Sequence, residues 1–307
     1  MITPVQLSYI FALLKHKNFQ RAAESCHVTQ PTLSMQLKKV EEDFGYQIFN
    51  RDTSPISLTT EGERLYPYLV NLQESLNLLE IEVQKLNGTY KSEVRIGIIP
   101  TVSSYLVPEL FTKWKSEIGD IHLDIKELTT ENLITAVNEK EIDLGIMAGP
   151  IESSSFNQQI LYNEEILLYT SSINKESIQL EELENITPWL LGPGNCLRTQ
   201  MINFCNLKET GTSKWNYEGG NMHLLTQMVE QEGGYTLVPA YEVPYLNLKP
   251  EMLKSIKDYI PIRQIIGIFL KRNTKQEEIT NIMRVIQRTK NTKIVDSEKV
   301  ELLPWKV

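Results

Sequence analysis

The sequence has few cysteines and histidines, the residues that form disulfides and bind metals, and it has no long apolar run. Its 307 residues include only three cysteines and four histidines, at spacings that match no metal site. A chain of this length can bury sizeable cores without disulfides, so the scarcity of cysteine favours a reducing compartment. The longest apolar run, at residues 265–270, is far shorter than the ~20 residues of a membrane span.

Other signatures are missing as well. The first 19 residues, MITPVQLSYIFALLKHKNF, show neither the charged leader nor the small-residue cleavage site of a signal peptide. No GxGxxG motif or phosphate-binding P-loop occurs in the sequence, and Gly233-Gly234 before YTLVPA is typical of a turn. We therefore expect a cytoplasmic protein with no membrane contact, no metal and no cofactor.

The net charge of −8 is unevenly distributed along the chain. Residues 1–60 contain six lysines and arginines against five aspartates and glutamates, a net of +1 that leaves −9 for the remainder. A DNA-binding head on an acidic body would show this asymmetry. The difference is small and does not by itself identify a nucleic-acid partner.

The first sixty residues show the pattern of three helices. The stretch TPVQ at residues 3–6 has the form of a capping box with proline in the first turn, and apolar residues follow at helical spacing. A second helix is predicted after Asn18, with Cys26 on its apolar face in a packing role. A third helix is predicted to begin after Thr29 and to end at Gly45.

The third predicted helix carries amides and hydroxyls on its outer face. Such side chains can pair with base edges, so the helix suits the recognition position of a helix-turn-helix in the major groove. The alternative is a polar, solvated face on an ordinary three-helix bundle. Two short extended runs, at 47–49 and 56–58, predict a β-wing that places Arg51 near phosphate or the minor groove.

A long helix is predicted from Thr60 to residue 86, with Thr60 and Glu63 as a capping box. Pro67 should kink this helix or shift its start. Apolar residues recur in alternating steps of four and three, at Leu65, Leu69, Leu72, Leu76, Leu79, Val83 and Leu86. A seam this narrow indicates a dimerising helix rather than an amphipathic helix packed on its own body.

From residue 92 the pattern alternates between strands and helices. Strands are expected at 94–99, 121–127, 142–147, 160–171, 189–191, 215–218, 235–238 and 265–270, and helices at 105–114, 132–137, 180–185, 196–204, 222–231 and 276–290. This order predicts an α/β domain of two lobes, in which ligands bind at the carboxyl ends of strands, in the cleft between the lobes.

Cys196 and Cys205 lie nine positions apart in GNCLRTQMINFC, residues 194–205. In one continuous helix nine residues rise by about 13.5 Å and leave the two sulfurs on opposite faces. A disulfide tolerates Cα separations of only ~4.4–6.8 Å, so this bond could not form unless the helix broke. The alternative is that both cysteines are packing residues. The first turn of the helix and Arg198 would each stabilise a thiolate at Cys196.

Residues 18–51, NFQRAAESCHVTQPTLSMQLKKVEEDFGYQIFNR, and LTTEG at 58–62 resemble the winged helix-turn-helix of LysR-type transcriptional regulators. The resemblance implies a DNA-binding domain at 1–60, a dimerising linker helix and hinge at 61–90, and an effector domain of periplasmic-binding-protein type at 91–307. Lobe I of that domain would cover about 91–162 and 266–303, and lobe II about 163–265.

The same resemblance implies the partners and the DNA-contacting residues. The partners would be double-stranded promoter DNA, RNA polymerase, and further copies of the chain in a dimer and a tetramer. The residues facing DNA would be Gln30, Pro31, Thr32, Ser34 and Arg51. The family usually has a second wing arginine three positions after the first, where this chain has Ser54.

Two further stretches, IGIIPTVSSYLVPEL at 96–110 and NCLRTQMINFC at 195–205, are similar to peroxide-sensing members of that family. The similarity implies that hydrogen peroxide is the signal, that Cys196 is the reactive thiol and that Cys205 resolves it in a reversible disulfide. The peroxide pocket would be formed by Thr101, Thr130, Asn195, Arg198 and Thr199. Asn195 and Thr199 stand where better-known members carry histidine and aspartate.

Two other functions fit parts of the pattern. One is a LysR-type regulator that responds to a small metabolite in the cleft between the lobes, with incidental cysteines. The other is a thiol peroxidase or another α/β enzyme, in which the wing, the groove-facing helix and the heptad seam would have no use. We therefore expect a transcription factor rather than an enzyme.

Overall fold

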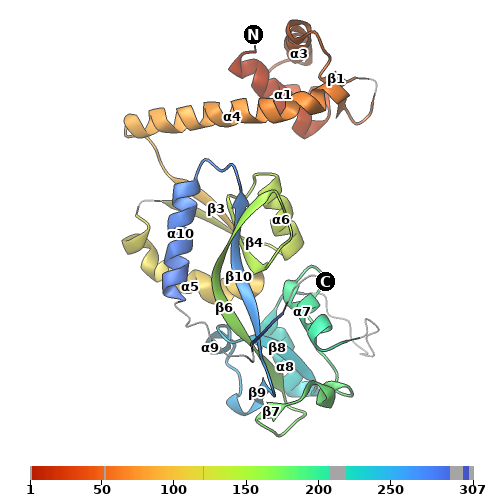
Figure 1. The fold of residues 1–307 in the computed structure, drawn as a ribbon, viewed down its shortest axis with the longest axis vertical. Helices are drawn as coiled ribbons and strands as arrows, with labels where there is room; N and C mark the ends of the chain where they lie inside the picture. The colour runs from red at the N-terminus through yellow and green to blue at the C-terminus, as the bar shows by residue number, and fades with distance from the viewer. Residues whose placement is uncertain (1, 52, 120, 208–218, 291–299, 304–307) are drawn as a thin grey trace. The chain divides into compact units, whose positions relative to one another are not determined.

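We analysed a computed structural model of the chain, shown in Figure 1, which describes residues 2–51, 53–119, 121–207, 219–290 and 300–303. The chain divides into two compact units, Met1–Tyr90 and Lys91–Val307. Within the described residues, no helix combines the length and the apolar character needed to cross a membrane.

The N-terminal unit is a winged helix-turn-helix followed by a long helix. Its elements are α1 (Pro4–His16), α2 (Phe19–Ser25), α3 (Gln30–Phe44), β1 (Phe49–Asn50), β2 (Ser57–Leu58) and α4 (Thr60–Leu86). The strands β1 and β2 pair antiparallel as the predicted wing. Thr3, Asn18 and Thr29 cap the first three helices as predicted, and Gly45 ends α3 with a φ of 73°. Cys26 packs against the core of this unit.

The start of α4 differs from the prediction. Its N-cap is Thr59 rather than Thr60, because the Thr59 hydroxyl accepts from the backbone N–H of Gly62 at 2.9 Å. A Cβ on Gly62 would lie 2.3 Å from the carbonyl oxygen of Ile48, so glycine permits the close approach of helix and wing. Pro67 does not shift the start, since the helix runs continuously through it.

The apolar seam of α4 divides into two parts. Leu69 is buried in the core of the head, and Leu65 and Leu76 pack against that core. The other four seam residues are 40–79% exposed in the single chain, and they are Leu72, Leu79, Val83 and Leu86. Near the start of the helix the seam therefore packs on the core of the N-terminal unit, and toward its end, from Leu79 to Leu86, the seam side chains are exposed.

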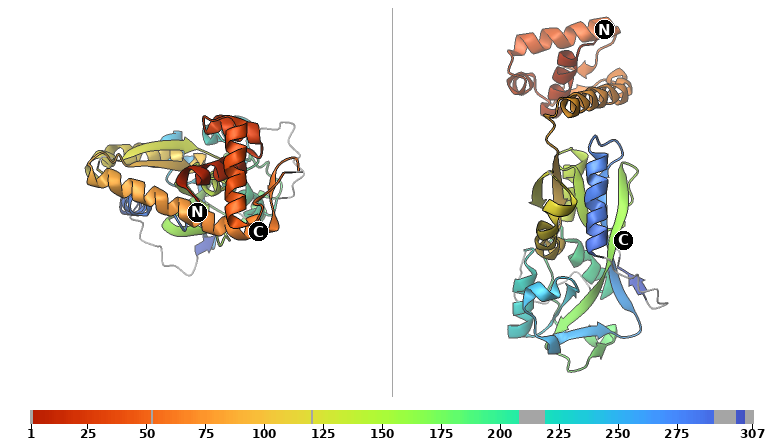
Figure 2. Two further views of the ribbon diagram at one scale, coloured as in Figure 1. Left: turned by 90° about the horizontal axis from the view of Figure 1, so that it is seen from above. Right: turned by 90° about the vertical axis from the view of Figure 1, so that its left-hand side faces the viewer.

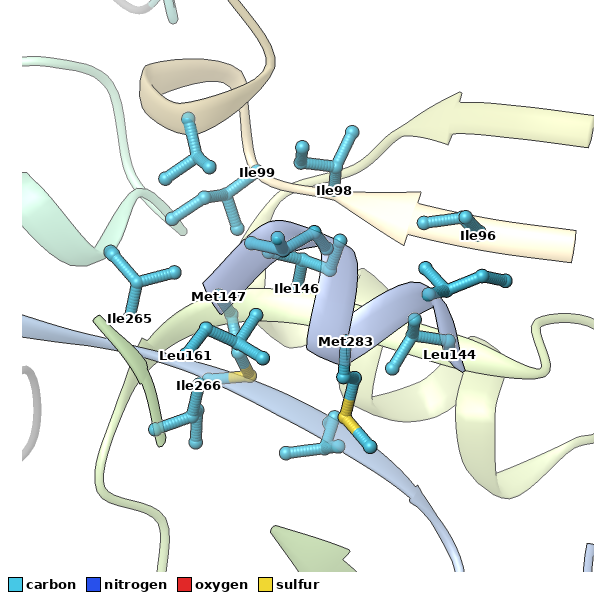
Figure 3. Close-up of a cluster of buried hydrophobic side chains, with 14 of the residues drawn as sticks. Ile96, Ile98, Ile99, Leu144, Ile146, Met147, Leu161, Ile265, Ile266 and Met283 are labelled. Carbon is cyan, nitrogen blue, oxygen red and sulfur yellow. The ribbon is translucent and has the colours of Figure 1, made fainter. Parts of the chain in front are cut away.

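The C-terminal unit is built on one extensive sheet. Lobe I contains β3 (Glu93–Ile98), α5 (Pro100–Glu117), β4 (His122–Glu127), α6 (Thr130–Asn138), β5 (Leu144–Gly149) and α10 (Gln276–Thr289), together with the first part of β6 (Phe156–Thr170) and the last part of β10 (Ile260–Leu270). Its strand order is β4-β3-β5-β10-β6. Figure 3 shows part of its core, a cluster of buried side chains that includes Ile98, Ile146, Leu161, Ile265 and Met283.

Lobe II has a second core, centred on the rest of β6. Its elements are β7 (Ser177–Ile178), the short 3-10 helix Leu180–Leu183, α7 (Cys196–Phe204), α8 (Met222–Glu232), β8 (Tyr235–Pro239), α9 (Val243–Leu246), a 3-10 turn Pro250–Met252, β9 (Leu253–Ile256) and β11 (Val300–Leu302). The long strands β6 and β10 run through both lobes, as Figures 1 and 2 show in green and blue. The predicted fold class is therefore confirmed.

Several local predictions in lobe II need correction. No strand forms at 189–191. Pairing with β8 is limited to one isolated parallel bridge between Pro188 and Tyr235, and beyond it the carbonyl of Trp189 accepts from the side-chain hydroxyl of Thr236. Only a short 3-10 turn forms within the predicted helix at 180–185. The strand predicted at 215–218 lies outside the described residues, and the strands β7, β9 and β11 were not predicted.

Candidate redox site and DNA-binding surface

The first turns of three helices meet around Cys196. Cys196 is the first residue of α7, Thr130 is the first residue of α6, and Thr101 is the second residue of α5. All three side chains are buried, and the N–H of Thr130 donates to the carbonyl of Gly194 at 3.2 Å, which ties α6 to the loop before α7. Helix N-termini present unpaired N–H groups and a positive dipole end, so this arrangement favours an anion.

A buried arginine completes this site. Arg263 on β10 has 0% exposed surface, and its guanidinium donates to both the hydroxyl and the carbonyl oxygen of Thr101 at 2.8 Å. Burial raises the pKa of the Cys196 thiol, and the charge of Arg263 opposes part of that rise. Arg263 is not among the predicted site residues, because the strand was predicted to begin at residue 265. The available signal was one arginine inside the apolar run IPIRQIIGIFL.

Arg263 is paired with a buried carboxylate on the neighbouring strand. Glu164 stands directly opposite Arg263 in the antiparallel register of β6 and β10, and Nε of Arg263 donates to Glu164 Oε2 at 2.8 Å. The same oxygen accepts from the Tyr105 hydroxyl at 3.1 Å, and Oε1 accepts from the N–H of Tyr241 at 3.1 Å. Tyr105 in turn lies 2.6 Å from the hydroxyl of Tyr162. Burial raises the pKa of Glu164 and of both tyrosines.

Two opposing effects act on the Cys196 thiol. Burial raises its pKa, while the charge of Arg263, the Thr130 hydroxyl and the N–H groups of Ala148 and Leu197 lower it; the net pKa lies above the usual value. The Thr130 hydroxyl is buried and forms no well-aligned hydrogen bond. Its neighbour is the Cys196 sulfur, which it approaches from the first turn of α6.

The other predicted pocket residues are close to Cys196 in the sequence. Asn195 directly precedes it, and Arg198 and Thr199 lie in the first turn of α7. The Asn195 side chain is buried and donates to the carbonyl of Gly192 at 2.8 Å. Arg198 donates to the carbonyl of Leu191 at 2.8 Å, so Arg263 rather than Arg198 supplies the charge on the thiol. Thr199 is half-buried, one turn after Cys196.

A cleft of about 500 Å³ opens beside Asn195. It lies at the ends of β3 and β4 and against the loops that precede α7 and α8. Its lining residues are Pro100, Glu127, Leu128, Thr129, Gly192, Pro193, Asn195, Gly219 and Gly220. Pro100, Thr129 and Asn195 directly precede Thr101, Thr130 and Cys196, so this cleft lies next to the buried site.

Cys205 lies in a different environment at the other end of α7. It is the C-cap of the helix and packs against the core of lobe II, whereas Cys196 belongs to the core of lobe I. Burial raises the pKa of Cys205 to about 12. Both thiols are free, and the intact helix holds them apart. Within the described part of the chain, no cluster of histidine, cysteine and acidic side chains could hold a metal ion.

The predicted DNA-facing residues cluster at the start of α3. Gln30 and Pro31 are exposed, and Thr32 and Ser34 are half-buried. Arg51 is held at the base of the wing: it pairs with Glu41 of α3 at 2.7 Å and stands over the Phe19 ring.

Glu41 joins the wing to α3. Its carboxylate accepts from the N–H groups of Ile48 and Phe49 at 2.9 and 3.2 Å, and it pairs with Arg51. The pairing fixes Arg51 close to Ser34, whose hydroxyl lies 3.5 Å from the guanidinium. Glu41 was not among the predicted functional residues.

A winged helix-turn-helix followed by a two-lobed α/β domain defines a class of ligand- or signal-responsive transcription regulators, and comparison with known families agrees. Residues 4–63 match the bacterial regulatory helix-turn-helix protein model of the lysR family, and residues 87–288 match the LysR substrate binding domain. The chain belongs to the LysR family of transcriptional regulators.

Similar proteins within this family include regulators of the peroxide response. The chain is 30% identical over 272 residues to the DNA-binding transcriptional dual regulator OxyR of Escherichia coli K12, covering 85% of this chain and 87% of that protein. It is 29% identical over 242 residues to the hydrogen peroxide-inducible genes activator of Pectobacterium carotovorum, covering 78% of this chain and 80% of that protein.

Solved structures similar to this chain also include OxyR proteins. A full-length OxyR variant from Pseudomonas aeruginosa superposes with a TM-score of 0.69 at 25% identity, covering 97% of this chain and 99% of that one. A hydrogen-peroxide-bound OxyR mutant from Corynebacterium glutamicum gives a TM-score of 0.58 at 25% identity, covering 94% and 92% of the two chains.

Proposed function

We propose that this protein is a hydrogen-peroxide-sensing transcription factor that binds promoter DNA and is switched by a reversible disulfide between Cys196 and Cys205. The observation that carries the proposal is the position of Cys196, buried where three helix N-termini meet and acted on by Arg263. The similarity to OxyR proteins supports peroxide as the signal.

The chemistry has two balanced steps. The Cys196 thiolate attacks one oxygen of hydrogen peroxide, the O–O bond breaks, and the other oxygen leaves as water after taking up a proton, so that the thiolate becomes a sulfenic acid. The Cys205 thiolate then attacks the sulfur of that sulfenic acid, the S–O bond breaks as the S–S bond forms, and the hydroxyl leaves as water after taking up a proton from solvent. Thr101, Thr130, Asn195, Arg198 and Thr199 are the proposed surroundings of the peroxide.

The second step requires a change of structure. The cysteines stand at opposite ends of α7 and pack on the cores of different lobes. A disulfide needs Cα atoms within about 7 Å of one another, so α7 must unwind before the bond can close. Repacking of this helix would alter the surface of the effector domain, and through it the spacing of the DNA-binding heads in the assembled protein.

The remaining assignments belong to the same proposal. Gln30, Pro31, Thr32, Ser34 and Arg51 would contact DNA. The exposed seam residues, Leu72, Leu79, Val83 and Leu86, would join two chains, whereas Leu65, Leu69 and Leu76 pack within their own N-terminal unit. Two dimers would form a tetramer that contacts RNA polymerase.

The decisive experiment is non-reducing mass spectrometry of the full-length protein after stoichiometric peroxide. A peptide joining Cys196 to Cys205 and the loss of two of the three thiols are expected. The Cys205→Ser variant should stop at a sulfenic acid that dimedone traps, and the Cys196→Ser variant should keep both remaining thiols. Three free thiols in treated wild-type protein would refute the proposal.

A second function is favoured by one observation, the cleft of about 500 Å³ beside Asn195. This volume suits a small metabolite better than peroxide, so the protein could respond to such an inducer with its cysteines incidental. In that case wild-type protein would keep its thiols under peroxide, and the Cys196→Ser variant would still respond to the inducer in a promoter-binding assay.

A further inference from the structure

The ion pair behind Cys196 joins two charges that are both fully enclosed by protein. Arg263 and Glu164 each have 0% side-chain exposure, and their contact of 2.8 Å sits at the point where β6 and β10 pass from one lobe to the other. Solvent does not screen charges at such depth, so the state of one partner strongly affects the field of the other. The field reaching the Cys196 sulfur is therefore that of the pair rather than of Arg263 alone.

The hydrogen bonds to Glu164 fit an ionised carboxylate paired with the charged guanidinium of Arg263. Its two oxygens accept from Arg263, from the Tyr105 hydroxyl and from the N–H of Tyr241. All three neighbours are donors at these contacts, and a carboxylate is the form that only accepts.

Arg263 is also held in place by this pair. One edge of its guanidinium bonds to Glu164, and its terminal nitrogens bond to Thr101 at the start of α5. Three groups from three other elements face the sulfur: Arg263 from β10, Thr130 from α6 and the Ala148 N–H from β5. Glu242 is a second carboxyl whose charge interacts with Arg263.

We infer that Glu164 is a positioning residue that fixes Arg263 against Thr101 and partly neutralises its charge, thereby restraining the reactivity of the Cys196 thiol. This inference rests on the proposed function in one respect, that Cys196 is the reactive thiol. An arginine without its carboxylate would draw Cys196 into the thiolate form and lower the peroxide concentration that oxidises it. The pair would therefore set the threshold of the sensor.

The test measures thiol reactivity in the absence of peroxide. Full-length protein carrying Cys26→Ser and Cys205→Ser leaves Cys196 as its single thiol, and its rate of alkylation by iodoacetamide is followed against pH. In this background Glu164→Gln is expected to shift the midpoint of the profile down by about one pH unit, which raises the rate near neutral pH about tenfold. Glu164→Asp, which keeps the charge, should leave the profile within about twofold of the starting protein.

A second variant is expected to change the alkylation rate in the opposite direction, and it keeps the test valid if Glu164→Gln does not fold. Tyr105→Phe removes the hydroxyl that donates to Glu164 Oε2, so more negative charge faces Arg263, and alkylation near neutral pH should slow by about twofold. Circular dichroism and urea unfolding establish which variants are folded. If Glu164→Gln does not fold, Tyr105→Phe decides alone.

The proposal is overturned by a folded Glu164→Gln protein whose midpoint is unchanged or higher, or by Tyr105→Phe with an unchanged or lower midpoint. A merely structural role of Glu164 would reduce stability and leave the pH midpoint in place. Since no peroxide is added, a failure to form the disulfide with peroxide would count against the proposed function and would not affect this result.

Discussion

Glu242 shows at the level of one residue how burial controls charge near this site. One of its oxygens accepts from the Ser104 hydroxyl at 3.0 Å, while the other is buried without a hydrogen-bond partner. Burial raises the pKa of its carboxyl to about 7, against the lowering by Arg263 and by Ser104. The carboxyl therefore changes charge near neutral pH while it stays inside the protein.

Replacement of Glu242 by glutamine should make the protein more stable at high pH. The folded pKa of about 7 lies above the unfolded value of about 4.3, so the neutral carboxyl favours the fold at low pH, and that stability is lost as the pH rises through 7. Relative to wild type, Glu242→Gln should gain roughly 2–3 kcal/mol in free energy of unfolding between about pH 4.5 and about pH 8.

Urea unfolding at a series of pH values measures this gain. Glu152→Gln, at an exposed position in a loop, is the matched control, and its free energy of unfolding should change with pH as that of the wild type does. Parallel curves for Glu242→Gln and wild type would show that Glu242 has no raised pKa in the folded protein.

At the level of elements, α7 carries both cysteines of the proposed redox site, and while it is intact it prevents the proposed disulfide. Its N-terminus supplies Cys196 and its C-cap supplies Cys205, while Gln200 in the middle is fully buried and donates to the carbonyl of Leu303 at 2.7 Å. These contacts stabilise the helix in the reduced protein. Under the proposed function, the rate of the second oxidation step should depend on the cost of unwinding it.

Asn203→Ala tests that dependence. The amide nitrogen of Asn203 is buried without a hydrogen-bond partner, and alanine has the higher helix propensity, so the change should stabilise α7 by about 1 kcal/mol. Disulfide formation should slow about fivefold, while trapping of the sulfenic acid by dimedone is unchanged. Asn138→Ala, the same change at the exposed last residue of α6, is the control. Equal disulfide rates in the two variants would mean that unwinding of α7 does not limit the reaction.

The attachment of the wing to α3 depends on Glu41. This carboxylate is buried and binds two backbone N–H groups of the wing as well as Arg51. Glu41→Ala would leave these groups without partners and should lower the free energy of unfolding of the head by about 2–4 kcal/mol, measured by thermal or urea denaturation. The adjacent Glu42 is exposed and pairs with Lys38 at 3.6 Å, so Glu42→Ala should change stability by less than ~0.5 kcal/mol. Similar losses in the two variants would contradict the anchoring role of Glu41.

Over the whole molecule, the sequence predicted what local patterns determine. The helix caps at Thr3, Asn18 and Thr29 depend on side chains a few positions away, and these predictions are confirmed. The partners Glu164 and Arg263 are 99 residues apart, and only the antiparallel register of β6 and β10 makes them neighbours. No spacing along the chain shows that register, so the cation of the site could not be predicted.

The correction at residues 189–191 has a similar origin. Trp189 and Leu191 are buried and apolar, as in a strand, yet their segment is an irregular loop. Its backbone groups bond to Tyr235 and Thr236, which are more than forty positions further along the chain. Burial is visible in the residue types, whereas the hydrogen bonds that choose between strand and loop are set by tertiary contacts.

The exposed seam residues of α4 are the apolar surface through which two chains would pair under the proposed function. In the single chain, Leu79, Val83 and Leu86 are 59%, 46% and 79% exposed, although their heptad spacing is that of a paired helix. Burying such side chains against a second copy would contribute about 1.5–3 kcal/mol for each residue. A charge at two of these positions should therefore abolish the pairing.

If α4 joins two chains as proposed, Leu79→Asp/Val83→Asp is expected to sediment as single chains, while the wild-type protein sediments as a larger assembly. Binding to promoter DNA, followed by fluorescence anisotropy, should weaken by about 100-fold, because each head then binds without the effective concentration that its linked partner provides. The control Asn77→Asp/Gln84→Asp adds the same charge at exposed positions of α4 outside the seam and should keep both the mass and the affinity of the wild-type protein. An unchanged mass for Leu79→Asp/Val83→Asp would show that α4 is not the pairing helix, and its exposed leucines would then need another partner.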